Sequence, residues 1–169
     1  MEAIVYTSNT GTTKEYAKLL SDKLSLPYYS LDEIKNKVKP GGKIIYLGWI
    51  MASGVKGYKK AIKDYDVCAV GAVGMGATGT QVKEVRTKNK IPSAIPVFTL
   101  QGGFDVKKLH GIYKIMMTIM VKTAGKGLAN KQDRTQEEDQ MLEMMLHGGK
   151  YVDEKNLKAI LDWYGKRGE

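Results

Sequence analysis

Hydroxyl, amide and glycine residues gather directly after the first apolar stretch of the chain. The apolar residues 3–6 lead into this segment, and an amphipathic pattern begins at Tyr16. The segment consists of Ser8, Asn9, Thr10, Gly11, Thr12 and Thr13. The order predicts a strand, a loop and a helix. Neutral donors and backbone N–H groups at a helix N-terminus, where the helix dipole is positive, suit a phosphate group.

This segment has two other interpretations. A nucleotide-hydrolase loop ends in Gly-Lys-Ser/Thr, which lets a lysine reach the terminal phosphates. Here Gly11 is followed by Thr12 and Thr13, so the segment matches that class poorly. Helix capping is the simpler alternative, because Ser and Thr cap helices widely. Capping explains Thr10 or Thr13 alone, whereas the cluster of six residues favours phosphate binding.

The spacing of apolar residues and breakers predicts an α/β fold. After the first strand, further strands are expected at Tyr28–Leu31, Ile44–Trp49, Asp66–Val73 and Pro96–Leu100, as apolar runs bounded by turn residues. A helix is expected at Val55–Lys63, and Asp32 is expected to cap a short helical turn. Strands that alternate with helices form a parallel sheet covered on both faces.

Ligands of such sheets bind at the carboxyl ends of the strands. Three predicted loops lie there: residues 7–13, 48–54 and 74–79. The fifth strand ends nearby in two glycines. We therefore expect one site, whose candidates besides residues 8–13 are Gly48, Trp49, Ile50, Met51, Ala52, Gly74, Met75, Gly76, Ala77, Gly102 and Gly103.

The pattern Ser8-x-Thr10-Gly11-x-Thr13, after a strand that ends in Tyr6, closely resembles the FMN phosphate loop of flavodoxins. The resemblance implies FMN as the cofactor, with its phosphate bound by neutral hydroxyls and amides. It implies a doubly wound five-stranded parallel sheet in the order 2-1-3-4-5, here with extra C-terminal helices. It also implies that backbone groups of residues 48–51 lie beside the flavin, and that residues 74–77 approach its pyrimidine ring.

Two features of these loops have alternative interpretations. Gly74, Gly76 and Gly79 spell the dinucleotide fingerprint G-x-G-x-x-G. That fingerprint belongs to the first strand and is followed about 20 residues later by an acid, whereas the next predicted strand here ends without one. We favour close approach to a flavin. Trp49 either stacks on the flavin ring or ends its strand as part of the core.

Charge bears on the redox chemistry and on the partners. The chain has 27 Lys and Arg against 18 Asp and Glu, for a net charge of +9, but the lysines are dispersed, and we expect no nucleic-acid binding. Residues 3–13, 41–63 and 67–83 contain no Asp or Glu. An acid-free site favours the anionic reduced flavin, so we expect two-electron or quinone-linked chemistry.

The last third of the chain carries additional helices. A Met-rich basic helix is expected over Val106–Lys126, a second helix opens with a capping box of Thr135 and Glu138, and Asp153 caps the last helix. We expect residues 1–169 to form a single flavodoxin-like domain. Residues 106–149 form a helical extension inserted before the last helix.

The segment from Phe98 through the Met-rich helix resembles flavodoxin-domain relatives of menaquinone-dependent protoporphyrinogen oxidase. Asn9 and Thr10 depart from that family, where a charged pair is usual, so the resemblance supports FMN but not a porphyrin substrate. It implies a quinone as partner, and the helix over Val106–Lys126 would then rest on an anionic membrane surface. In the alternative, its methionines pack as core.

Further expectations concern function class and location. We expect either an electron carrier with a redox partner protein or a quinone-linked oxidoreductase. The alternative from another class is a non-catalytic nucleotide- or anion-binding module. No signal peptide or membrane span is apparent, which predicts a cytoplasmic protein, at most peripheral to the membrane. Cys68, the single cysteine, is expected to be buried and inert.

Overall fold

The computed structural model describes residues 1–104 and 111–167. One sheet dominates the fold, and its parallel strands are β1 (Ala3–Thr7), β2 (Tyr28–Ser30), β3 (Lys43–Met51), β5 (Asp66–Gly74) and β6 (Val97–Gln101). They lie in the order β2-β1-β3-β5-β6, and the short β4 (Gly54–Val55) pairs antiparallel with β3. The α/β class and the parallel sheet flanked by helices are thus confirmed.

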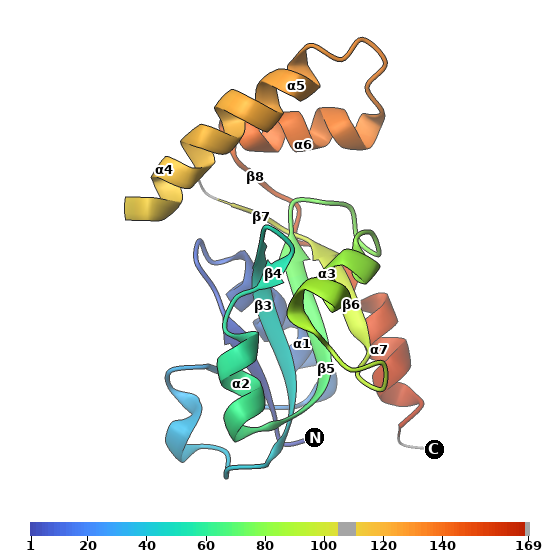
Figure 1. The fold of residues 1–169 in the computed structure, drawn as a ribbon. Helices are drawn as coiled ribbons and strands as arrows, with labels where there is room; N and C mark the ends of the chain where they lie inside the picture. Colours follow the sequence, from blue (N-terminus) through green and yellow to red (C-terminus); the bar gives the residue numbers. More distant parts are fainter. Residues whose placement is uncertain (105–110, 168–169) are drawn as a thin grey trace.

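Helices cover both faces of this sheet (Figure 1). On one face lie α1 (Thr12–Leu24) and α7 (Lys158–Gly165), and on the other lie α2 (Tyr58–Asp64) and α3 (Val82–Asn89). The described part of the chain also contains the 3₁₀ turns η1 (Ile34–Asn36) and η4 (Glu154–Leu157). Both termini lie at the end of the molecule opposite the helical extension.

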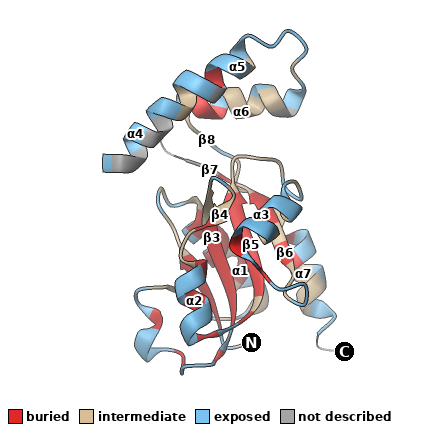
Figure 2. Cartoon of the chain, in the orientation of Figure 1, coloured by how far each residue is buried: buried red, intermediate tan, exposed pale blue. Residues whose placement is uncertain are grey.

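The core consists of two apolar layers that the sheet separates. Tyr16, Leu20 and Ile160 pack from α1 and α7 on one face, and Tyr58 and Val85 pack from α2 and α3 on the other. Figure 2 shows the buried residues concentrated in the strands. Central strands buried on both faces explain why their sequences are continuous apolar runs rather than alternating ones.

Several predicted boundaries were wrong around the third strand. It continues to Met51 and turns back into β4, so residues 48–51 are strand rather than loop. The predicted helix Val55–Lys63 begins only at Tyr58, because Val55 pairs with Ile50. Asp32 caps no helix in the structure: η1 has no side-chain cap, and the Asp32 carboxylate binds the Lys60 ammonium at 2.8 Å.

Cys68 is half-buried rather than buried. The strand register explains its position, since Ile44 pairs with Val67 while Ile45 pairs with Ala69. Cys68 is therefore the extra residue of a β-bulge. Burial, followed by the nearby Asp66 carboxylate, raises the pKa of its thiol, which fits the expected inert side chain.

The helical extension sits on a two-stranded stem above the carboxyl ends of the parallel strands (Figure 1). Its elements are β7 (Gly103–Phe104), α4 (Gly111–Met120), the π-helical η3 (Val121–Gly125), α5 (Lys126–Ala129), α6 (Gln136–His147) and β8 (Gly149–Lys150). The predicted helix Val106–Lys126 is thus divided, and its residues 106–110 lie outside the described part of the chain.

The predicted capping box of α6 is confirmed, whereas the Asp153 cap lies one element earlier than predicted. At α6, Thr135 Oγ1 accepts a hydrogen bond from the N–H of Glu138, and the Glu138 carboxylate accepts one from the N–H of Thr135. Asp153 accepts the N–H of Lys155 at 2.9 Å, although the cap opens η4 and not α7 itself. Within the described residues, no helix is long and apolar enough to cross a membrane.

Candidate cofactor site

The loop after β1 leads directly into the N-terminus of α1. Gly11 has φ +107°, a conformation that favours glycine, and its N–H donates to Ser8 Oγ at 3.2 Å. Thr12 Oγ1 donates to the carbonyl oxygen of Gly103 at 3.1 Å. Thr13 Oγ1 is buried and has no hydrogen-bond partner among the described residues. An orphaned buried hydroxyl is rare, and here it lies in the first turn of a helix, where anions bind.

The second part of the site is the β3–β4 hairpin. Ala52 and Ser53 form its two-residue turn with φ of 47° and 59°, as in a type I′ turn. Gly48 has no room for a side chain, because a Cβ there would lie 2.5 Å from Val55 Cγ1 and 2.7 Å from the Lys56 carbonyl oxygen. This close approach packs Val55 and Lys56 directly against the backbone of β3.

A tyrosine ties this hairpin to the end of β1. The Tyr46 hydroxyl donates to the carbonyl oxygen of Lys56 at 2.6 Å and lies 2.7 Å from Thr7 Oγ1. Since its one proton is used on Lys56, Thr7 is the donor to Tyr46. Burial raises the pKa of Tyr46 far above its usual value, and the hydrogen bond from Thr7 opposes that shift.

The third part of the site is the loop between β5 and α3, which β6 holds in place. The N–H of Gly79 donates to the Thr99 carbonyl at 3.1 Å, Thr99 Oγ1 donates to the Thr80 carbonyl at 2.6 Å, and Thr78 Oγ1 accepts the N–H of Gln101 at 2.9 Å. A Cβ on Gly79 would meet nothing within 4 Å. The last glycine of a dinucleotide fingerprint serves close helix–strand packing, so this geometry weighs against that alternative.

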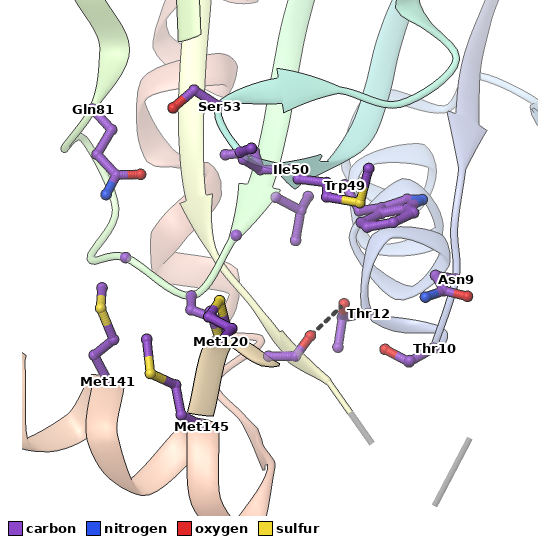
Figure 3. A pocket seen from close by; sticks show the side chains of 17 residues that line it. Asn9, Thr10, Thr12, Trp49, Ile50, Ser53, Gln81, Met120, Met141 and Met145 are labelled. Atoms are coloured by element: carbon purple, nitrogen blue, oxygen red, sulfur yellow. Dashed lines mark hydrogen bonds between the residues drawn. The ribbon is translucent and has the colours of Figure 1, made fainter. Parts of the chain in front are cut away.

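A cavity of about 460 Å³ lies between these three parts and the helical extension (Figure 3). Asn9, Thr10 and Thr12 lie on one side of it, and Trp49 and Ile50 form part of its wall. Side chains of the extension complete it: Met120, Met141 and Met145. A cavity of this volume can hold a ligand of the size of a cofactor.

The structure brings many of the predicted residues together on this cavity. They are Asn9, Thr10, Thr12, Trp49, Ile50, Met51, Ala52, Gly74, Met75, Gly76 and Gly103. The other candidates do not line the cavity: Ser8, Gly11, Thr13, Gly48, Ala77 and Gly102. Gly102 is buried, and its N–H donates to the Gly74 carbonyl at 2.7 Å, so its role is to join β5 to β6. The Ala77 carbonyl oxygen accepts a hydrogen bond from the hydroxyl of Thr80 within the same loop.

Five lining residues lie outside the predicted loops: Val73, Gln81, Met120, Met141 and Met145. Ser53 lies in the predicted loop 48–54 but is not among the candidates named from the sequence. The position of Ser53 depends on the unforeseen hairpin. Gln81 has φ +60° directly before α3, and no residue pattern indicates that conformation for a glutamine. Met120 ends α4, and Met141 and Met145 lie four residues apart on α6, but periodicity does not say which surface a helix covers.

The cavity wall has a uniform electrostatic character. Its lining residues include no Asp, Glu, Lys or Arg. The ammonium of Lys56 lies 5.7 Å from the centre of the Trp49 ring, within the range of a cation–π interaction. A flat apolar ring between Trp49, Ile50 and the methionines, with an anionic group toward the N-terminus of α1, suits this arrangement.

No family model matches this chain, and no curated protein or solved structure shows significant similarity to it.

Proposed function

We propose that this chain is an FMN-binding, flavodoxin-like redox protein. The observation that carries the proposal is the cavity, where the segments after β1, β3 and β5 meet at the carboxyl ends of a parallel sheet. The strand order β2-β1-β3-β5-β6 supports it, because omission of β4 leaves the flavodoxin-like order 2-1-3-4-5. The uncompensated hydroxyl of Thr13 supports a phosphate at the start of α1.

Each part of the site has its own task in this proposal. Ser8 and Thr13 do not line the cavity, so the proposed phosphate position is beside it, at the first turn of α1. There Thr13 Oγ1, Ser8 Oγ and the first N–H groups of the helix donate to the phosphate. Thr12 is a weaker candidate than the sequence indicated, because its proton is used on Gly103. Trp49 and the methionines of the extension exclude water from the ring. FMN, when bound, supplies the electron-transfer chemistry.

The uncharged wall favours reduction by two electrons. No carboxylate in the described part of the cavity repels negative charge on a reduced flavin. The FMN-loaded protein should therefore be reduced in a single two-electron transition during a redox titration. Two well-separated one-electron transitions would contradict this part of the proposal.

A quinone-linked oxidoreductase at a membrane is the second candidate, and the outer face of α4 favours it. Ile115 and Ile119 are 61% and 56% exposed, and Lys114 and Lys122 flank them. The hydroxyl of Thr118 donates to the Lys114 carbonyl at 2.9 Å, so this polar group is satisfied within the helix. Residues 111–132 contain no Asp or Glu. An apolar and cationic helix face suits an anionic bilayer surface.

Vesicle sedimentation tests this second candidate. The protein should bind vesicles that contain phosphatidylglycerol more tightly than phosphatidylcholine vesicles, and the paired change Ile115→Ser and Ile119→Ser should abolish binding. Ile62→Ser is the matched control, because Ile62 is 46% exposed on α2, away from the extension. Equal losses in both variants, or no binding to either vesicle, would contradict a membrane role and leave a soluble partner protein as the electron donor or acceptor.

Titration with FMN and with riboflavin tests the main proposal. FMN should bind more tightly than riboflavin because only FMN carries the phosphate, and Thr13→Val should reduce this preference roughly tenfold. A colourless protein that ignores FMN, yet binds nucleotides or other anions, would favour a non-catalytic binding module instead.

A further inference from the structure

A buried amide on α3 holds the tip of the β3–β4 hairpin. Asn89 is only 8% exposed. Its Oδ1 accepts the N–H of Val55 at 2.8 Å, and its Nδ2 donates to the carbonyl oxygen of Ser53 at 2.8 Å. A third bond, from Nδ2 to the Val85 carbonyl at 2.7 Å, ties the same amide to its own helix. The side chain thus joins α3 to the turn residue Ser53 and to Val55 in β4.

The hairpin tip needs such support because its backbone is strained. Ala52 and Ser53 both adopt positive φ, a region that non-glycine residues rarely occupy. Strained conformations persist only where the surroundings hold them, and they gather at ligand sites. Five consecutive residues of this hairpin, 49–53, line the cavity.

We propose that Asn89 is a positioning residue for the cofactor. It does not line the cavity itself, but its amide bonds Ser53, which does. By its bonds to Ser53 and Val55 it fixes where Trp49, Ile50 and Met51 meet the ring. The proposal rests on the FMN-binding function proposed above and names the residue that prepares that site before the cofactor arrives.

Asn89→Ala removes both bonds to the hairpin. We expect its Kd for FMN to rise roughly tenfold, because two hydrogen bonds that hold the bound conformation are lost. Adding Ser53→Gly should recover most of this loss, since glycine adopts positive φ without strain. Rescue of this kind is not expected if Asn89 contributes only to core packing.

Ile34→Ala is the matched control for stability. Ile34 is 1% exposed in the same apolar layer but lies on η1 and does not line the cavity. This variant should lose stability and keep its Kd for FMN, measured below its unfolding temperature. Equal increases in Kd for Ile34→Ala and Asn89→Ala would overturn the proposal, as would an unchanged Kd in a folded Asn89→Ala protein.

Hydrogen exchange in the cofactor-free protein separates this inference from the proposed function. The amide of Val55 should be protected in the wild type and exchange rapidly in Asn89→Ala. If the Val55 amide exchanges equally slowly in Asn89→Ala, Asn89 does not hold the hairpin, and the proposal is overturned even if the protein binds FMN. If Asn89→Ala does speed the exchange of Val55 but the wild type binds no FMN, then the proposed function fails, and with it the role of Asn89 in cofactor binding.

Discussion

The hydroxyl of Thr12 donates a 3.1 Å hydrogen bond to the carbonyl oxygen of Gly103, 91 residues further along the chain. Thr12 opens α1 beside the proposed phosphate position, and Gly103 begins the stem of the helical extension. A second link supports the same junction, since the ammonium of Lys150 in β8 lies 2.8 Å from the Glu15 carboxylate in α1. The helical extension that closes the cavity is therefore attached to the first turn of α1.

Gly103→Ala should destabilise this junction. Gly103 has φ +152°, and a Cβ there would collide with the backbone of Gly149 in the paired strand. We expect the free energy of unfolding to fall by about 2 kcal/mol, measured by urea denaturation. Gly127→Ala is the control, because a Cβ there meets nothing within 4 Å in α5, and it should be neutral or stabilising. Equal effects of both changes would contradict the close approach.

Tyr46→Phe should change how stability depends on pH. Burial raises the pKa of Tyr46 above the value of about 10 that it has in the unfolded chain. The folded state therefore retains the proton longer, and this contribution is present below about pH 10 and is lost as pH rises above it.

In Tyr46→Phe, the bonds to Lys56 and Thr7 are lost, so we expect about 2 kcal/mol less stability at pH 7. Because phenylalanine does not ionise, the difference between wild type and variant should shrink as pH rises above about 10. Urea denaturation of both proteins at pH 7 and again above about pH 10 measures this difference in stability. A difference that grows with pH would show that the sign assigned to Tyr46 is wrong.

Thr135→Ala should weaken α6, which carries Met141 and Met145 to the cavity. The loss of the capping box should cost about 1 kcal/mol, seen as lower helical stability in far-UV circular dichroism. Thr118→Ala makes the same chemical change in the middle of α4, where the hydroxyl bonds only its own helix, and it should stabilise slightly. A Thr135→Ala protein as stable as the wild type would refute the role of the cap.

Some of this architecture follows from the sequence and some does not. The loops after β1 and β5 were predictable because glycine and hydroxyl residues interrupt apolar runs, and parallel strands bring their ends together. The hairpin at Ala52 and Ser53 was not, because neither residue normally signals positive φ. Likewise Asn89 looks like any polar residue at a helix end, and only the fold shows that its amide meets the hairpin.

The most direct measurement is a methyl spectrum of the protein with labelled methionine, recorded by NMR before and after the addition of FMN. Aromatic ring currents should shift the methyl signals of the cavity residues Met51, Met75, Met120, Met141 and Met145. Met144, which is buried in α6 but does not line the cavity, should shift much less. Shifts confined to other methionines, or no shifts at saturating FMN, would contradict a flavin site in this cavity.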